Sequence, residues 1–165
     1  YAGVGSSTGA NYLPTLQASL DLDFAVGGGW VAGLGLSHSE IRDGHRNTLL
    51  QAGPTLYLGN WISTLRYQRN ISNPGRLESS AVSLDVRHGA SYREAWQSLH
   101  VGWGGEAYEA MNVMQDVTGR GGSVMLTAHQ PITAQWAFKG TVEWGEKQGA
   151  YRYWGGTLAL TISFN

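Results

Sequence analysis

The chain is predicted to be an all-β protein that folds as an antiparallel transmembrane β-barrel of ten strands. Three observations lead to this fold class. Apolar and polar residues alternate with a period of two, the connections between such segments alternate between short and long, and most tryptophans fall at segment ends. A period of two gives a strand one apolar and one polar side, whereas a helix would show a period near 3.6.

The alternation recurs in nine segments, and no stretch has the pattern of an amphipathic helix. In the first segment, Leu20, Leu22 and Phe24 alternate with Asp21 and Asp23. The nine predicted strands cover residues 16–24, 30–39, 50–58, 61–68, 82–87, 98–104, 124–129, 136–144 and 157–164. A tenth strand over Tyr1–Ser6 gives the even number that is usual for bacterial outer-membrane barrels.

The connections support the same layout. Short turn signals occur at residues 27–29, 59–60 and 131–133, with a somewhat longer turn at 88–94. Polar loops are predicted at residues 40–46, 70–75, 109–121 and 146–150. Short turns on one side and longer loops on the other are typical of outer-membrane barrels. We therefore predict one barrel domain over residues 1–165, as a mature chain or as the C-terminal barrel of a longer one.

Composition excludes several other classes of protein. The 165 residues hold 11 Lys and Arg against 12 Asp and Glu, which gives no basic footprint for nucleic acid. The absence of cysteine excludes disulfides, zinc–thiolate sites and cysteine nucleophiles. No run of about 18 apolar residues is present, so a transmembrane helix is not expected. Glycine is frequent, with 24 residues, as tight turns and a narrow barrel interior require.

The tryptophans favour a membrane barrel over a soluble β-sandwich, which would also alternate apolar and polar residues. Two aromatic girdles are predicted, one after the short turns and one near the loops. They consist of Trp30, Trp61 and Trp136 on the turn side and of Trp103, Trp144 and Trp154 on the loop side. Trp136 and Trp144 are eight residues apart, roughly 26 Å along a strand. A sandwich core gives no reason for tryptophans to gather at strand ends, whereas two membrane interfaces do.

The other side of the predicted strands carries small, polar and charged residues, and we expect it to line the barrel interior. The predicted interior charges are Asp21, Asp23, Arg66, Asp85, Arg87, His100, Glu106, Lys139 and Glu143. Because an isolated charge in a narrow interior is unfavourable, the mixed signs predict pairing across strands. A network of paired charges that fills the narrow interior is one interpretation. A polar path for a sugar chain or a small solute is the functional alternative.

Three stretches resemble the YaiO-type outer-membrane barrels. They are Ser37-His38-Ser39-Glu40-Ile41-Arg42-Asp43, Tyr57-Leu58-Gly59-Asn60-Trp61, and Ser98-Leu99-His100-Val101-Gly102-Trp103-Gly104-Gly105-Glu106. The resemblance extends over about residues 14 to 164. It implies an outer-membrane barrel of a kind often found beside, or fused to, exopolysaccharide-secretion components with helical repeats. The 165 residues hold no such repeat and are too few for the sixteen strands of the large polysaccharide export pores.

No catalytic or cofactor-binding pattern is evident. Ser37, His38, Ser39 and Glu40 bring together nucleophile, base and acid, but on a strand His38 points away from the two serines. Because the membrane-facing positions are apolar or aromatic, we expect no Ser–His pair of a lipid-modifying barrel enzyme there. The histidines, at positions 38, 45, 88, 100 and 129, lack metal-ligand spacing, so neither a metal nor a cofactor is expected.

The sequence thus predicts a barrel of the bacterial outer membrane that is not an enzyme. Its expected role is that of a conduit or accessory component in the secretion of exopolysaccharide or cell-envelope material. A plugged structural anchor or receptor barrel is the first alternative, and a lipid-modifying barrel enzyme is the second. Expected partners are outer-membrane lipid or lipopolysaccharide, exopolysaccharide and secretion-complex proteins, and not nucleic acid.

Overall fold

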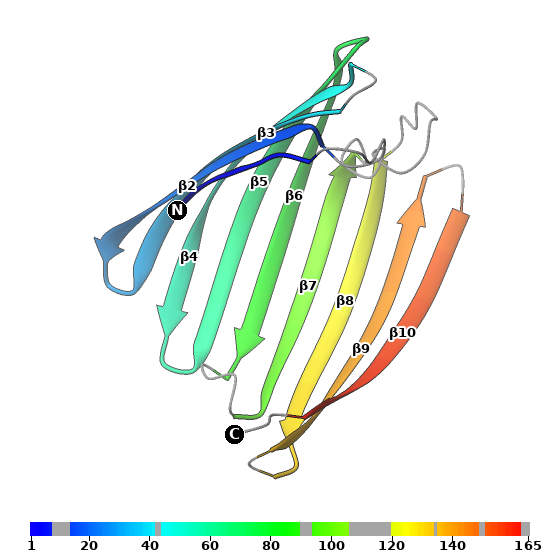
Figure 1. The fold of residues 1–165 in the computed structure, drawn as a ribbon. Coiled ribbons are helices and arrows are strands. Elements are labelled where there is room, and N and C mark those ends of the chain that lie inside the picture. The colour runs from blue at the N-terminus through cyan, green and yellow to red at the C-terminus, as the bar shows by residue number, and fades with distance from the viewer. Residues whose placement is uncertain are drawn as a thin grey trace.

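The chain forms one antiparallel sheet of ten strands, whose order in space is their order in the sequence (Figure 1). The computed structural model describes residues 1–7, 14–41, 44–89, 94–105, 120–133, 135–148 and 151–162. The predicted all-β antiparallel architecture and the ten strands are both confirmed. No helix of the described residues is long and apolar enough to cross a membrane.

Apart from the first, the strands are long. They are β1 (Ala2–Gly5), β2 (Leu16–Gly27), β3 (Trp30–Glu40), β4 (Arg46–Leu58), β5 (Trp61–Asn73), β6 (Leu77–His88), β7 (Trp96–Gly105), β8 (Arg120–Pro131), β9 (Trp136–Lys147) and β10 (Tyr151–Ile162). A tilted strand of about 9–11 residues crosses the hydrocarbon core of a membrane. Strands β2 to β10 are therefore long enough to cross it.

The glycine-rich turn between β2 and β3 is tight because its residues adopt backbone conformations that favour glycine. Gly27, Gly28 and Gly29 have φ angles of 101°, 60° and 81°. A Cβ atom at Gly29 would also lie 2.3 Å from the carbonyl oxygen of Tyr57 on β4. The turn therefore needs glycine both for its backbone angles and for its close approach to the neighbouring strand.

The predicted loop at residues 70–75 is wrong in its extent. Strand β5 continues to Asn73 and β6 begins at Leu77, so a short turn replaces most of that loop. Asn70 is only 2% exposed, and Ser72 Oγ donates a hydrogen bond to Asn47 Oδ1 at 2.9 Å. The polarity of these residues predicts a loop, whereas Asn70 and Ser72 lie on β5 and form hydrogen bonds with neighbouring polar side chains.

The sheet has an apolar face and a polar face, as the register shows. Leu20 lies opposite Leu36, and Leu22 opposite Leu34, which places them together on what we call the apolar face. The residues between them, such as Asp21 opposite Gly35, lie on the other side, which we call the polar face. Large apolar side chains remain exposed on the apolar face, and no hydrophobic residue of the described ranges is buried. Continuous exposed apolar surface of this extent is typical of a membrane-contacting protein.

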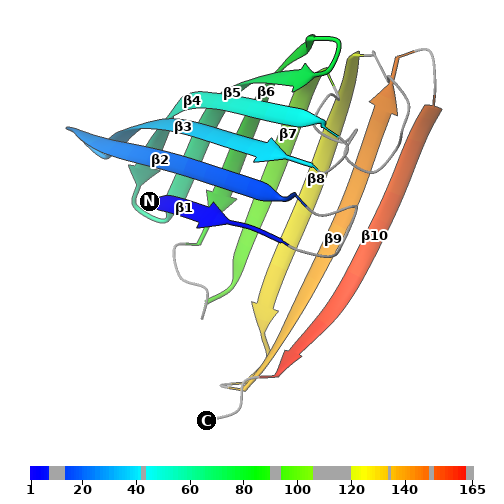
Figure 2. The same ribbon diagram turned by 45° about the horizontal axis from the view of Figure 1, so that its top comes forward.

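The polar face is the concave side of the curved sheet. Gln51 Nε2 on β4 donates a hydrogen bond of 2.9 Å to Asp21 Oδ1 on β2, so the two side chains meet across the intervening strand. The buried polar side chains, which are Asn70, Thr127 and Lys147, also lie on this face. Figure 2 shows the curvature, because β1–β4 run roughly from side to side in this view and β8–β10 run roughly from top to bottom.

The sheet is open between its first and last strands. Among the described residues, β10 pairs only with β9, along twelve residues, and β1 pairs with only four residues of β2. The linear strand order therefore begins at β1 and ends at β10.

Candidate functional site

Six of the seven tryptophans lie on the apolar face, at its two ends. At the turn end, Trp30 lies opposite Leu56, and Trp136 lies opposite Ile162. Trp61 shares their face, and its ring centroid is 4.6 Å from that of His88. At the loop end, Trp144 lies directly opposite Trp154, and Trp103 lies opposite Val82. These positions match those predicted for the two aromatic girdles, and contact with the membrane interfaces remains a prediction.

The interior charges predicted on β2 to β7 lie on the polar face, where several are joined by hydrogen bonds. Gln51 connects Asp21 to Arg66, because Arg66 Nη1 donates to Gln51 Oε1 at 3.4 Å. Asp85 and His100 lie opposite each other on β6 and β7, with 2.7 Å between Oδ1 and Nδ1. Asp23 lies opposite Gly33 on the same face. Asp21 and Arg66, which carry opposite charges, are thus linked through the neutral side-chain amide of Gln51 rather than directly.

The remaining predicted interior charges lie mainly on the C-terminal strands. Glu143 lies opposite Gly155 and accepts a hydrogen bond of 2.9 Å from the Tyr153 hydroxyl. Arg87 lies opposite Ser98, and Lys139 opposite His129, both on the polar face. Glu106 lies outside the described residues. Two threonine pairs, Thr55–Thr64 at 3.0 Å and Thr127–Thr141 at 3.2 Å, add hydroxyl groups to this face.

The seventh tryptophan, Trp96, lies on the polar face at the turn end and is the centre of a cluster. Its ring stacks on His129, with 5.5 Å between centroids and 15° between planes. The Arg87 guanidinium carbon lies 4.6 Å from the Trp96 ring centroid, and Lys139 Nζ lies 5.9 Å from it. These distances are those of cation–π contacts. Arg87 and Lys139 therefore approach an aromatic ring here.

A second polar cluster lies on the apolar face, at the loop end of β3 and β4. His38 lies directly opposite Thr48, with 2.9 Å between Nδ1 and the threonine hydroxyl. Glu40 lies opposite Arg46, whose Nε is 3.0 Å from the carboxylate, and His38 Nε2 lies 3.6 Å from the same carboxylate. The expectation that this face carries only apolar or aromatic residues is therefore wrong at its loop end.

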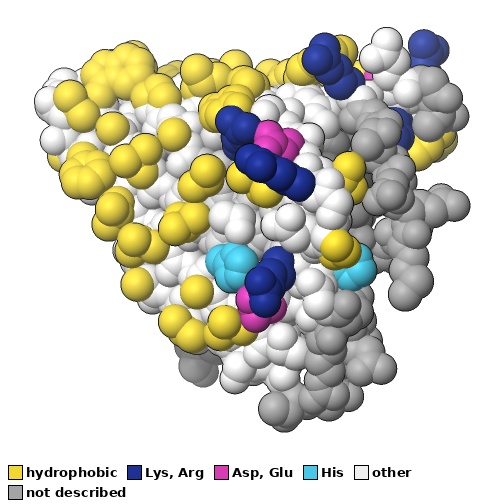
Figure 3. Space-filling view, turned by 90° about the horizontal axis from the view of Figure 1, so that it is seen from above, with side chains coloured by type: hydrophobic (Ala, Val, Ile, Leu, Met, Phe, Trp, Pro, Cys, Tyr) yellow, Lys and Arg dark blue, Asp and Glu magenta, His cyan; other side chains and the backbone are white. Residues whose placement is uncertain are grey.

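Further ion pairs lie at the same end of the apolar face. Arg69 and Arg76 both contact Glu78, and Arg152 contacts Glu146 at 3.2 Å. Within the described ranges, every Asp, Glu, Lys and Arg of the apolar strand faces lies in the loop-end half. Seen from above (Figure 3), basic side chains lie against acidic ones, and hydrophobic side chains cover the flank beside them. The two ends of the apolar face thus differ in charge.

The sequence matches a known family of membrane proteins. The model of the YaiO membrane beta barrel domain matches residues 1–109, which is more than half of the chain. The chain belongs to the YaiO membrane beta barrel family. No curated protein and no solved structure matches it. The predicted family is therefore confirmed, and family membership places the protein in a membrane.

Two features of this YaiO-family barrel were missed in the sequence. Trp96 follows the predicted turn at 88–94, as the turn-side girdle tryptophans follow theirs, but it alternates in step with Ser98 and His100, and the register confirms that it lies on the polar face. Its cross-strand partner is His129, which alternation along 124–129 places on the polar face because Leu126 and Ala128 point to the apolar face. Thr48 was missed because it precedes the predicted strand 50–58, whereas β4 begins at Arg46.

The His38 cluster contains a hydroxyl, an imidazole and a carboxylate, but its geometry differs from that of a hydrolytic triad. Glu40 lies 3.6 Å from His38 Nε2, beyond hydrogen-bonding distance, and forms its shorter contact with Arg46. In a triad the carboxylate orients the imidazole through a hydrogen bond. Among the described residues, no group of three His, Cys, Asp or Glu could hold a metal ion.

Proposed function

We propose that the protein is a barrel of the bacterial outer membrane that serves as a conduit or accessory component in the secretion of exopolysaccharide or cell-envelope material. The observation that supports this function best is the concave polar face, on which side chains of β2, β4, β5, β6 and β7 form hydrogen bonds. The Asp21–Gln51–Arg66 chain and the Asp85–His100 pair lie on it. Hydroxyl, amide and charged groups of this kind hydrogen-bond to sugar hydroxyls, and the same face would hold water in a closed barrel.

The placement in the outer membrane is part of the proposal. Long strands with an apolar face on one side and a polar face on the other are the pattern of outer-membrane barrels. The loop end, with its exposed charges, would then face the outside of the cell, and the short turns would face the periplasm.

Planar-bilayer recording of the refolded protein tests the conduit. We expect stepwise ion currents that decrease when a soluble oligosaccharide of N-acetylglucosamine or of glucose is added. Arg66→Gln removes one charge from the proposed path and should change the cation-to-anion permeability ratio. Arg152→Gln, on the apolar face, is the matched control and should leave the ratio unchanged. An absence of current at every voltage would overturn the conduit.

The Trp96 cluster supports a second candidate, a plugged structural or receptor barrel. His129 covers one face of the Trp96 ring and Arg87 lies close to the same ring, so the cluster fills space at the turn end of the polar face. If this cluster closes the interior, the wild-type protein carries no current and Trp96→Ala carries one. This result would select the plugged barrel over the conduit.

A further inference from the structure

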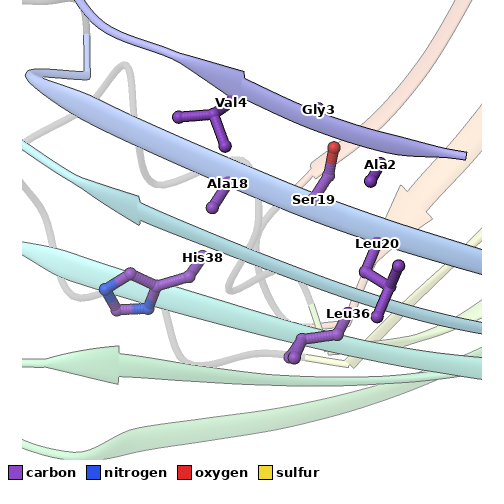
Figure 4. A pocket seen from close by; sticks show the side chains of 8 residues that line it. All are labelled: Ala2, Gly3, Val4, Ala18, Ser19, Leu20, Leu36 and His38. Atoms are coloured by element: carbon purple, nitrogen blue, oxygen red, sulfur yellow. The ribbon is translucent and has the colours of Figure 1, made fainter.

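A groove on the apolar face continues directly into the His38 cluster. The groove has a volume of about 270 Å³ and is lined by side chains of β1, β2 and β3 (Figure 4). Its lining forms two rows across the strands. One row is Val4, Ala18 and His38, and the other, nearer the turns, is Ala2, Leu20 and Leu36. Ala18 is smaller than Val4 and His38 on either side of it, and Ala2 is smaller than its neighbour Leu20, which leaves the surface hollow at both rows.

The groove is apolar over most of its length and polar at one end. His38 is the last residue of the loop-end row, and it also forms a hydrogen bond with Thr48. One side chain therefore belongs to both the groove and the cluster. Beside it, Arg46 is 61% exposed. Its ion pair with Glu40 uses Nε, and so it does not occupy the N–H groups of the two terminal nitrogens. Those donors are able to form bidentate hydrogen bonds with a phosphate.

The charges around the cluster favour an anion. On β3 to β6 and the turn between β5 and β6, the apolar side of the loop end carries Arg46, Arg69 and Arg76 against Glu40 and Glu78. Among the described residues, this set has an excess of one positive charge. The two glutamates hold the arginines in place without neutralising all of them.

We propose that this groove and cluster form a binding site for a phosphorylated lipid of the surrounding membrane leaflet. One acyl chain lies along Val4, Ala18 and Leu36, and the phosphate of the headgroup contacts Arg46, His38 and Thr48. An amphiphile fits because the groove offers apolar contact and its loop end offers charged donors at the level where headgroups lie. The site rests on the proposed placement in the outer membrane but does not depend on the conduit.

Lipid binding to the refolded protein in detergent tests the site, with bisphosphorylated lipid A as the probe and its dephosphorylated form as the comparison. We expect the phosphorylated lipid to bind more tightly. Arg46→Gln should weaken its binding about fivefold, as loss of one charge near a membrane surface implies. It should leave the dephosphorylated lipid unchanged. Arg152→Gln is the matched control, because Arg152 also pairs through Nε with a glutamate but lies outside the groove.

The groove is tested separately. Ala18→Phe fills it and should weaken the binding of both lipids about tenfold, the effect of two methylene groups that lose apolar contact. Ala128→Phe, also on the apolar face but on β8, is its control. Heat-modifiable gel migration verifies that each variant is folded.

Equal affinity for the two lipids would overturn the proposal. Equal losses in the variants and their controls would overturn it too, because they would indicate general contact with lipid. Displacement of the lipid by an equal concentration of inorganic phosphate would indicate a free-phosphate site instead. The conduit is distinguished by conductance, since an absence of current would leave this lipid binding intact.

Discussion

Asp21 and Gln51 form a hydrogen bond of 2.9 Å directly over Gly35, which occupies the strand between them. A Cβ atom at Gly35 would lie 2.3 Å from Gln51 Nε2 and 2.6 Å from Asp21 Oδ1. Both atoms end flexible side chains, so they are able to move aside at the expense of their hydrogen bond. At Gly53 a Cβ atom would lie 1.8 Å from the carbonyl oxygen of Leu65, which is backbone and is held by the sheet.

The first prediction concerns these two glycines. Gly35→Ala should lower the free energy of unfolding by about 1 kcal/mol, the value of one net hydrogen bond. Gly53→Ala should lower it by about 3 kcal/mol, because the backbone of β5 must shift. Urea titration of the protein in lipid vesicles measures both. Gly155→Ala is the control, since a Cβ there meets nothing within 4 Å. Equal losses at Gly35 and Gly53 would contradict this account of the polar face.

The second prediction concerns the Trp96 cluster. Because Trp96 is only half-buried, Trp96→Ala should lower the free energy of unfolding by less than the ~3–5 kcal/mol that is typical of a fully buried ring. Cation–π contacts with Arg87 and Lys139 contribute roughly 0.5–2 kcal/mol each of such a loss. Trp103→Ala, on the apolar face, should leave any ion current unchanged, whereas Trp96→Ala should increase it. A current that is unaffected by Trp96→Ala would show that the cluster does not narrow a path.

The third prediction uses tryptophan fluorescence to separate the two faces. Brominated lipids should quench the six tryptophans of the apolar face, and Trp96 should be protected from them. Trp96→Phe should therefore increase the fraction of the fluorescence that lipid quenches, whereas Trp144→Phe should decrease it. Equal quenched fractions in the two variants would contradict the assignment of the faces.

The fourth prediction concerns catalysis by the His38 cluster. Because Glu40 does not hydrogen-bond to His38, we expect the wild-type protein neither to hydrolyse nor to transfer acyl chains of lipid A. His38→Ala, Thr48→Val and His100→Ala should give the same lipid profile in mass spectrometry. A modified lipid in the wild type that disappears in His38→Ala but persists in His100→Ala would establish an enzyme instead.

The sequence was sufficient for the fold because its pattern has a period of two over nearly every strand. Leu20, Leu22 and Phe24 alternate with aspartates, and no other regular element shows this pattern. The strand ends were less certain. The polarity of Asn70 and Ser72 predicts a loop, because polar residues in a soluble protein mark exposure to solvent, whereas here they also mark the concave face.

The candidate sites were less predictable, because they depend on register across strands. Gln51 is an ordinary polar residue in the sequence, and it becomes a link between Asp21 and Arg66 only when β2, β4 and β5 are aligned. Along its strand, Trp96 lies where a girdle tryptophan would lie, but its side chain is on the polar face. Alternation within one strand determines the face on which each side chain lies, but it does not determine which side chains of different strands are in contact.

The short first strand gives the sheet one weak edge. Four residues of β1 pair with β2, whereas twelve residue pairs join β9 to β10. Backbone hydrogen bonds at an edge that has few neighbours open more readily than those inside a sheet. Deuterium exchange should therefore begin at Ala2–Gly5 and spread into β2 before it reaches the central strands. In mechanical terms the sheet has one weak end, and a pulling force would separate β1 from β2 before it separates any other pair of strands.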